Sequence, residues 1–289
     1  MKGTDREPVT LRIEKLHEAI GAEVLGVDLA RPLGGAQIAA IEAAWLEHVV
    51  LVFRGQQLDQ EAQLRFAGQF GTVGERSRPA EIRPEGADFH PAIMLVSNIR
   101  ENGRPIGSLP DGEMWFHHDM CYVAEPYRGT MLYAIDIPSH GGNTLFANMY
   151  AAYDRLGAAT KERIAGARAL QVYNYSVTER VSLDAELDGY PHFVQPVAIT
   201  HPRTGRKALY VNPLITARIE GLPEDESDSL LEELFGFTGD RGLIYEHVWR
   251  EGDLVMWDNW CSCHARTDFP ETERRLLRRC TILGEALAE

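Results

Sequence analysis

Short apolar runs dominate the chain and predict many strands. Near the N-terminus, the segments 22–29 (AEVLGVDL) and 48–55 (HVVLVFRG) are rich in valine and leucine. Between them, apolar residues recur at helical spacing at Ile38, Ile41 and Trp45. Apolar residues at every third or fourth position predict an amphipathic helix, whereas short valine-rich runs predict strands. The first segment is therefore expected to be strand, helix, strand.

A second helix is predicted at 59–71, where Asp59 is a candidate N-cap and Gly71 a candidate stop. Proline and glycine then separate four strand patterns, at 92–98, 114–122, 129–136 and 143–149. The chain thus continues as mainly strand after its two helices.

The region at about 150–250 mixes helical and strand patterns. A helical pattern covers about 150–170, and the segments 193–200 and 207–212 flank a Thr-Gly turn and predict a hairpin. The acidic run at 224–228 precedes several leucines. Carboxylates in the first turn of a helix favour its dipole, so this run predicts a helix start rather than a binding site.

Three strand patterns end the chain, at 252–259, 261–269 and 274–284. No repeat, low-complexity tract or linker interrupts the sequence. We therefore expect one domain over 1–289, mainly β with flanking helices. A helix-containing insertion at about 150–250 would lie between the strands that carry the candidate metal ligands.

Composition and charge narrow the function classes. The chain has 289 residues, of which 44% are hydrophobic and 25% charged, which is ordinary for a soluble protein of this size. Its net charge of −14 disfavours nucleic acid and anionic membranes as partners, so a basic site would be local. No apolar run approaches about 18 residues, and the start lacks a signal-peptide pattern. We expect a cytoplasmic protein with reduced cysteines.

The stretch 114–122 (MWFHHDMCY) carries the first candidate site. In a strand, side chains two apart share a face, so Asp119 can converge with His117 but not with His118. An imidazole and a carboxylate in this arrangement provide two ligands of a 2-His-1-carboxylate triad, which holds non-haem Fe(II). The alternative is structural: His117 packs against Trp115 and Asp119 caps a turn.

The best candidate for the third ligand is His264, in the segment 257–267 (WDNWCSCHART). In a jelly roll, strands remote in sequence meet at one mouth, which would bring His264 to the histidine and aspartate of the earlier motif. A purely structural role for His264 remains open. So does a zinc site of His264 with Cys121, Cys261 and Cys263, although these cysteines lack the usual C-x₂₋₄-C spacing.

Arginines on the last predicted strand indicate an anion site. Alternation places Arg275 and Arg279 on one face, and Arg274 and Arg278 on the other. A buried arginine needs an anion, and the guanidinium fork matches a carboxylate. An exposed edge strand with solvated arginines is the alternative.

The sequence resembles the Fe(II)/2-oxoglutarate-dependent dioxygenases of the taurine dioxygenase and 2,4-dichlorophenoxyacetate dioxygenase type. Seven segments stand in that family's order and spacing: GAEVLGVDL, LVFRGQQL, FAGQFGTVG, FHHDMCY, PSHGGNTLFANMYAAYDRL, HPRTGRKALYVNP, and GDLVMWDN followed by a histidine and RRCTILG. The resemblance implies a double-stranded β-helix (jelly-roll, cupin-like) core. It also implies iron bound by His117, Asp119 and His264.

The same resemblance implies how the cosubstrate binds. Thr144 and Arg279 would hold the carboxylate of 2-oxoglutarate, and Arg275 matches another frequently basic position near that site. The chain departs from the family at Phe116 and Trp260, where tryptophan and arginine are common. Neither departure removes a metal ligand. Both positions are close in sequence to the ligands, so the two departures could change the shape of the substrate pocket.

The reaction implied by the resemblance consumes 2-oxoglutarate and O₂ and releases succinate and CO₂ while a substrate is hydroxylated. A metal-dependent hydrolase and a non-catalytic cupin-like binding protein remain the alternatives. The protein is expected to be a homo-oligomer, either a dimer or a tetramer.

The prime substrate is expected to be a small organic anion, a carboxylate or sulfonate, with an apolar or aromatic body. Arg76 matches the position of the taurine enzyme's sulfonate-binding histidine and lies near Arg78 and Arg83 in an otherwise acidic chain. These arginines could instead pair with neighbouring glutamates on a solvated loop. The candidate apolar wall consists of Met114, Trp115, Phe116 and Tyr122.

Overall fold

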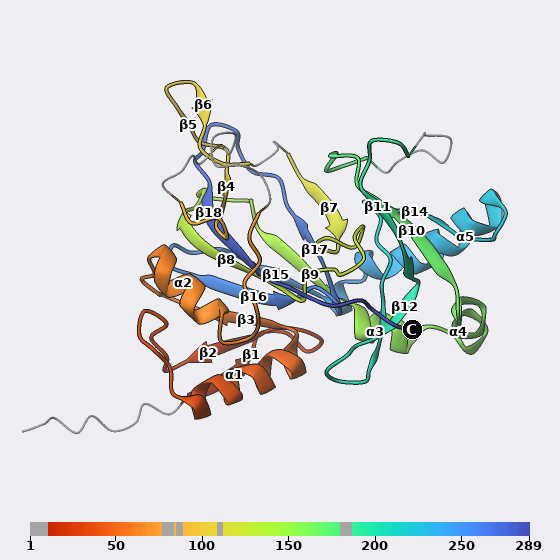
Figure 1. The fold of residues 1–289 in the computed structure, drawn as a ribbon, viewed down its shortest axis with the longest axis horizontal. Coiled ribbons are helices and arrows are strands. Elements are labelled where there is room, and N and C mark those ends of the chain that lie inside the picture. The colour runs from red at the N-terminus through yellow and green to blue at the C-terminus, as the bar shows by residue number, and fades with distance from the viewer. Residues whose placement is uncertain (1–10, 77–83, 85–88, 109–111, 180–186) are drawn as a thin grey trace, which may run out of the picture.

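Two facing β-sheets form the centre of the molecule (Figure 1). The computed structural model describes residues 11–76, 84, 89–108, 112–179 and 187–289. Its larger sheet, in spatial order, contains β1 (Arg12–Lys15), β2 (Ala22–Leu25), β3 (Val50–Phe53), β16 (Leu254–Asp258), β8 (Gly129–Asp136), β18 (Leu276–Ile282) and β4 (Met94–Ser97). The smaller sheet contains β15 (Ile244–His247), β9 (Thr144–Asn148), β17 (Ser262–Arg266) and β7 (Met114–His117). This arrangement is the expected double-stranded β-helix.

Side-chain alternation in the larger sheet separates two hydrophobic clusters. On β3, Val50 and Val52 pack toward the smaller sheet, whereas Leu51 and Phe53 pack toward the helices. The helices that cover this outer face are α1 (Gly35–His48) and α2 (Gln60–Ala67) (Figure 1). Because both faces of the sheet are covered at this point, β3 (VLVF) is apolar along its whole length.

The predicted strand, helix, strand at the N-terminus is confirmed, and so is the N-cap of the second helix. The Asp59 side chain accepts a hydrogen bond of 2.7 Å from the backbone N–H of Ala62. The helix ends at Ala67, however, and not near Gly71. Phe70 is buried just beyond it, with its ring 5.1 Å from that of Phe66, so the chain turns inward there.

The region 150–250 contains both helices and strands. Its described elements are α3 (Met149–Arg155), α4 (Ala158–Ile164), β10 (Arg168–Val172), β11 (His192–Pro196), β12 (Ala198–Thr200), β13 (Lys207–Leu209), β14 (Thr216–Ile219) and α5 (Glu224–Phe235), with 3₁₀ turns at Gly236–Gly239 and Arg241–Leu243. The predicted hairpin is confirmed as β12 and β13. The helical pattern was wrong beyond Ile164, because Gly166 has φ 71° and Arg168–Val172 forms a strand between β11 and β14.

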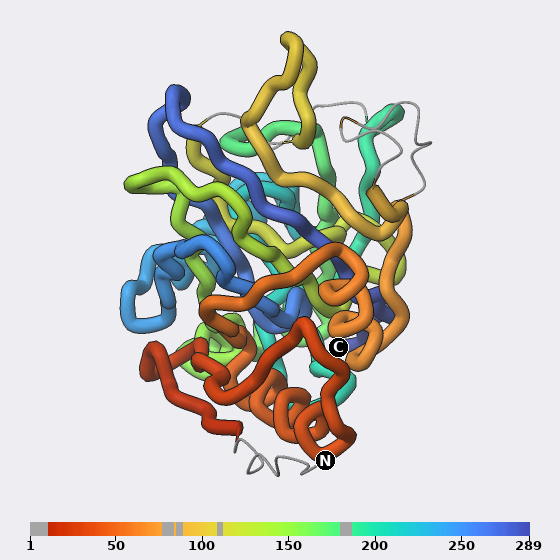
Figure 2. The backbone as a smooth tube through the Cα atoms, turned by 90° about the vertical axis from the view of Figure 1, so that its left-hand side faces the viewer, coloured from red at the N-terminus to blue at the C-terminus, as the bar shows by residue number. Residues whose placement is uncertain are grey.

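The C-terminal strands are in the predicted order and place the last arginines in the middle of a sheet. β18 pairs with β8 on one side and with β4 on the other (Figure 2). An exposed edge strand is therefore excluded for Leu276–Ile282. A short hairpin of β5 (Arg100–Glu101) and β6 (Arg104–Pro105) projects from one end of the molecule. None of the described helices is long and apolar enough to cross a membrane.

Candidate metal centre and active site

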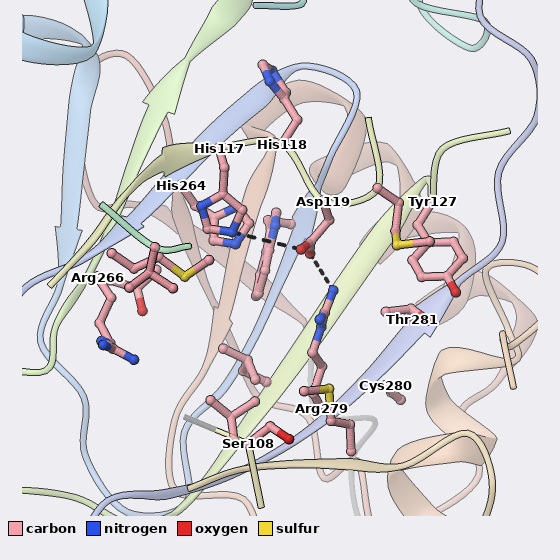
Figure 3. A pocket seen from close by; sticks show the side chains of 18 of the residues that line it. Ser108, His117, His118, Asp119, Tyr127, His264, Arg266, Arg279, Cys280 and Thr281 are labelled. Atoms are coloured by element: carbon pink, nitrogen blue, oxygen red, sulfur yellow. Dashed lines mark ion pairs between the residues drawn. The ribbon is translucent and has the colours of Figure 1, made fainter. Parts of the chain in front are cut away.

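A cavity of about 410 Å³ lies between the two sheets. The smaller sheet lines it with residues of β7, β9 and β17, and the larger sheet with residues of β4, β8 and β18. His117, Asp119 and His264, the three candidate metal ligands, all face this cavity (Figure 3). The structure therefore brings together residues that are up to 147 positions apart in the sequence.

Strand pairing explains how the three candidate ligands meet. His264 on β17 is the cross-strand partner of His117 on β7, and their ring centroids are 4.1 Å apart. His117 Nε2 lies 4.0 Å from Asp119 Oδ1. Taken together, one ligand atom from each of the three residues lies within 4.8 Å of the others. Two imidazoles and a carboxylate at this spacing fit a single divalent metal ion and leave coordination positions open.

The strand that carries His117 is shorter than predicted. β7 ends at His117, and Asp119 lies in the following turn, where Met120 adopts a left-handed φ of 57°. Strand alternation therefore applies only as far as His117, and the turn returns Asp119 to the same side. Trp115 is 39% exposed and contributes its carbonyl oxygen, rather than its ring, to the His117 imidazole.

Hydrogen bonding prepares His117 as a metal ligand. Its Nδ1 lies 2.9 Å from the carbonyl oxygen of Trp115, which can only accept, so Nδ1 carries the proton. The lone pair of Nε2 then faces Asp119. Burial lowers the pKa of His117 and of His264, which keeps both imidazoles neutral at pH 7. A neutral imidazole with its second nitrogen fixed is the form that binds metal.

Asp119 is held by its other carboxylate oxygen. Oδ2 accepts a hydrogen bond of 2.7 Å from Thr130 Oγ1 and lies 2.7 Å from Arg279 Nη2. Burial raises the pKa of Asp119, but the Arg279 guanidinium and the hydrogen bond from Thr130 act against it, and the pKa is below its usual value. The carboxylate is therefore ionised, with Oδ1 directed toward His117.

His118 has the opposite surroundings to His117. Its side chain points away from the cluster (Figure 3) and is buried beside Tyr210, with ring centroids 4.6 Å apart. His118 Nδ1 lies 3.3 Å from Cys263 Sγ and 3.3 Å from Asn212 Nδ2. Burial, with the neighbouring His117, lowers the pKa of His118 to about 3. This geometry agrees with the expectation that His118 does not share a metal with Asp119.

The cysteines do not gather around His264 in the described part of the chain. Cys263 contacts His118, whereas Cys261 lies with His201 and Asp258. His201 Nδ1 accepts two backbone N–H bonds of 3.2 Å, so the proton is on Nε2, which donates to Asp258 Oδ2 at 3.1 Å. That histidine is satisfied as a structural donor, and a zinc site built on the cysteines and His264 is not formed.

The four arginines near β18 lie on two faces, as alternation predicted. Arg279 lines the cavity, whereas Arg278 points toward α2 and donates to Gln63 Oε1 and the carbonyl oxygen of Leu58, each at 2.7 Å. Arg274 forms an exposed ion pair with Asp136. Arg279 on one face of the strand thus lines the cavity, and Arg278 on the other face connects the sheet to α2 by a hydrogen bond.

Arg275 provides unsatisfied donors at one end of the cavity. It is only 2% exposed, and its Nη2 donates to the carbonyl oxygen of Gly142 at 3.2 Å. Within the described residues, its Nε and Nη1 have no hydrogen-bond partner. Burial, reinforced by Arg266, lowers the pKa of Arg275 to about 9. A buried guanidinium in this state is ready to bind an anion.

The segment beside Arg275 is shaped to let it approach. Gly142 has φ 63°, and a Cβ there would lie 3.1 Å from Arg275 Nε, so glycine fits where a side chain would crowd the guanidinium. Two residues later, Thr144 lines the same cavity. The oxygen of Thr144 accepts a hydrogen bond of 3.0 Å from Trp249 Nε1, a contact that no sequence pattern indicated.

Arg279 and Arg76, expected at the cosubstrate and the substrate, both line the cavity, as Thr144 does. Arg279 Nη2 also lies 2.7 Å from Asp119 Oδ2, a contact that the sequence did not indicate. The roles of both arginines toward a ligand stay predictions. Arg78 and Arg83 lie outside the described residues.

The apolar wall of the cavity differs from the expected one. Met114 and Tyr122 line the cavity, but Trp115 and Phe116 line a separate, smaller depression. Tyr173 takes part instead, with its ring stacked on Tyr122 at a centroid distance of 4.9 Å and an interplanar angle of 9°. Tyr173 follows β10, the strand that the sequence pattern missed. Trp260 is buried away from the lining and donates to the carbonyl oxygen of Pro126.

Known proteins are similar to this chain in sequence and in fold. The model of the family described as "Taurine catabolism dioxygenase TauD, TfdA family" matches residues 12–281. The (S)-phenoxypropionate/alpha-ketoglutarate-dioxygenase of Sphingobium herbicidovorans is 34% identical, covering 96% of each chain. The pentalenolactone F synthase of Streptomyces avermitilis is 36% identical, covering 94% of this chain and 93% of the relative.

A solved structure has the same architecture. The crystal structure of AAD-2 in complex with Mn(II) and N-oxalylglycine superposes with a TM-score of 0.78 at 28% identity, covering 97% of this chain and all of the other. These matches, spanning nearly the whole chain, favour a dioxygenase over the hydrolase and the non-catalytic binding protein. The chain belongs to the TauD, TfdA family and is a metal- and 2-oxoglutarate-dependent dioxygenase.

Proposed function

We propose that the protein uses Fe(II) and O₂, with 2-oxoglutarate, to hydroxylate a small organic anion, releasing succinate and CO₂. One observation carries the proposal: a buried 2-His-1-carboxylate cluster shares a cavity with Arg275, whose Nε and Nη1 lack partners among the described residues. Fe(II) bound by such a triad would supply the O₂ chemistry that links decarboxylation of 2-oxoglutarate to hydroxylation of the substrate. His117, Asp119 and His264 would hold it.

Arg275 and Thr144 are proposed to hold the carboxylate of 2-oxoglutarate that lies far from the metal. Arg275 is buried with two donors to offer. Thr144 lines the same cavity and comes two residues after Gly142, whose carbonyl oxygen accepts from Arg275. This differs from the pairing of Thr144 with Arg279 that the family resemblance implied. One nitrogen of the Arg279 guanidinium contacts Asp119, a candidate metal ligand. Arg279 is therefore better placed to act beside the metal than at the carboxylate of 2-oxoglutarate that lies far from it.

The prime substrate is proposed to bind through Arg279 and Arg76, which both line the cavity. A guanidinium has five N–H donors, so Arg279 can contact Asp119 and still donate to a carboxylate or sulfonate. Tyr122, Tyr173 and other apolar side chains would enclose the substrate body. The likeness to a phenoxypropionate dioxygenase favours an aryloxyalkanoate within this class.

Succinate release tests this function directly. Protein reconstituted with Fe(II) and ascorbate is given 2-oxoglutarate and one member of a panel of aryloxyalkanoates, arylalkanoates and alkylsulfonates. At least one anion should stimulate succinate formation that requires air, and the substrate should gain one oxygen atom by mass spectrometry. The matched variant is Arg76→Gln, which should raise the KM of the substrate but not that of 2-oxoglutarate. Stimulation only by neutral or cationic compounds would contradict the anionic substrate.

We also propose that the chain acts in the cytoplasm as a single domain over 1–289, forming a dimer or tetramer without nucleic-acid or membrane partners. The net charge of −14 supports the absence of polyanionic partners. Light scattering on eluting protein measures the assembly, and a monomeric mass would contradict it.

A further inference from the structure

Trp249 is a buried side chain that contacts Thr144, one of the residues that line the cavity. It is 5% exposed and its indole Nε1 lies 3.0 Å from Thr144 Oγ1. An indole nitrogen is a donor only, so the threonine oxygen must accept this hydrogen bond. Trp249 itself does not line the cavity as Thr144 does. The contact therefore acts on the cosubstrate site through Thr144.

Other buried side chains fix the position of the indole. His247, the cross-strand partner of Thr144, packs edge to face on Trp249, with ring centroids 4.5 Å apart. His247 Nδ1 lies 3.0 Å from Tyr245 Oη, and its Nε2 lies 3.2 Å from Asp253 Oδ2. Asp253 is paired in turn with Arg54. A tryptophan held in this way keeps its N–H aimed at one atom.

We propose that Trp249 is a positioning residue that makes Thr144 a hydrogen-bond donor toward the cosubstrate, so that the site selects a carboxylate over the corresponding amide. This inference rests on the proposed binding of the remote carboxylate by Arg275 and Thr144. Because the Thr144 oxygen already accepts the indole N–H, its own proton is directed elsewhere, and the buried threonine borders the cavity.

The chemistry of the site follows from this orientation. Arg275 offers only donors, and Thr144 is biased toward offering its O–H when the Trp249 N–H occupies one of the two lone pairs of its oxygen. A carboxylate accepts from all of them. The amide of the same acid would turn an NH₂ group toward donors and leave buried polar groups unpaired, which costs affinity. Without the indole N–H, the Thr144 hydroxyl could turn its proton toward Trp249 and face the amide with both lone pairs, so discrimination between the two would fall.

Binding measurements without turnover test this role. Dissociation constants for 2-oxoglutarate and 2-oxoglutaramate, its 5-amide, are measured by calorimetry on Mn(II)-loaded protein in the absence of O₂. Trp249→Phe keeps the ring and removes the N–H. It should weaken 2-oxoglutarate binding roughly tenfold and reduce the acid-to-amide ratio by a similar factor. In iron-loaded protein, the KM for 2-oxoglutarate should rise while kcat at saturation stays near that of the wild type.

Trp260→Phe is the matched control, because Trp260 is also a buried tryptophan whose N–H donates to one atom, the carbonyl oxygen of Pro126. It should leave the ratio unchanged. If Trp249→Phe does not fold, benzothienylalanine at position 249 keeps the shape of the indole and removes only the N–H.

Thr144→Val distinguishes the proposed carboxylate site from the proposed role of Trp249. If Thr144→Val leaves 2-oxoglutarate affinity unchanged, the proposed carboxylate site is wrong. If Thr144→Val weakens binding but loss of the N–H at position 249 leaves the acid-to-amide ratio at its wild-type value, the role of Trp249 is overturned and the carboxylate site stands. Loss of the ratio in both variants, with no further loss in the double variant, supports the inference.

Discussion

Adjacent side chains in this protein have opposite chemical roles. His117 is fixed by a backbone carbonyl so that its other nitrogen faces Asp119, while His118 is enclosed by Tyr210, Asn212 and Cys263. Both imidazoles are buried and neutral. The difference between them is therefore one of direction, which the end of β7 at His117 determines.

Alanine substitutions should separate these roles. His117→Ala and His264→Ala each remove a metal ligand and should abolish both stoichiometric Fe(II) binding and 2-oxoglutarate turnover. His118→Ala should retain metal binding but lose about 1–3 kcal/mol of unfolding free energy, because buried polar neighbours lose their partner. Metal content by mass spectrometry and urea denaturation provide the two readouts. Equal loss of metal in all three variants would contradict the assignment.

Arg275 and Arg279 differ in burial and in neighbours, so their loss should affect different ligands. Arg275→Met should weaken 2-oxoglutarate binding by about 2–5 kcal/mol, because a desolvated charge pair loses one partner. Arg279→Met should chiefly raise the KM of the prime substrate. Calorimetry with 2-oxoglutarate and steady-state kinetics measure the two effects. The reverse pattern would restore the pairing of Arg279 with Thr144 that the family resemblance implied.

At the scale of the element, β18 shows how one strand serves two purposes. Its cavity face carries Arg279, whereas Arg278 on the opposite face bonds Gln63 and the carbonyl oxygen of Leu58. Because the strand is internal, both faces are covered and neither arginine is solvated freely.

Arg278→Met tests this division. The substitution leaves the Leu58 carbonyl and the Gln63 side chain without their donor, so the free energy of unfolding should fall by about 1–3 kcal/mol. The KM values for 2-oxoglutarate and substrate should stay close to those of the wild type. Urea denaturation and succinate release measure both quantities. An increase in KM as large as that of Arg275→Met would mean that α2 contributes to the site.

Local sequence patterns predicted an element well where its apolar residues followed a single periodicity, either that of a strand or that of a helix. The predicted strand at 129–136 coincides with β8, and the three candidate ligands were proposed from the H-x-D spacing, a distant histidine and the family resemblance. β10 was missed because the helical pattern was extended through Gly166 to about residue 170, whereas Gly166 has φ 71° and β10 begins at Arg168.

Contacts between remote elements could not be predicted in the same way. Tyr173 reaches the cavity from a missed strand, and Trp249 meets Thr144 only because β15 pairs with β9. Alternation indicates which face a side chain occupies but not which partner the opposite element presents. For this reason the sequence placed Arg275 and Arg279 on one face without showing that Arg279 meets Asp119.

At the scale of the whole molecule, the two sheets contribute different functional residues to the same cavity. The smaller sheet and the turn after β7 supply the candidate metal ligands and Thr144, whereas the larger sheet supplies Arg279, with Arg275 just before β18. The site therefore depends on both sheets being packed. Loss of overall folding would remove metal, cosubstrate and substrate binding together.

The buried histidines make this packing sensitive to acid. Burial lowers the pKa of the partly exposed His48 and of four fully buried imidazoles in the folded protein: His117, His118, His247 and His264. In the unfolded chain each returns to a pKa of about 6.5 and takes up a proton below that value. The unfolded state then binds more protons than the folded state, so the stability present above pH 6.5 is lost as the pH falls.

Metal-free protein in the presence of a chelator should therefore lose several kcal/mol of unfolding free energy between pH 7.5 and pH 5, about 2 kcal/mol for each histidine that stays neutral when folded. Urea denaturation at a series of pH values measures this loss. His247→Gln should reduce the slope by up to one proton, because it removes one of the four buried groups. Stability that stayed constant or rose as the pH fell from 7.5 to 5 would show that the buried imidazoles accept protons in the folded protein.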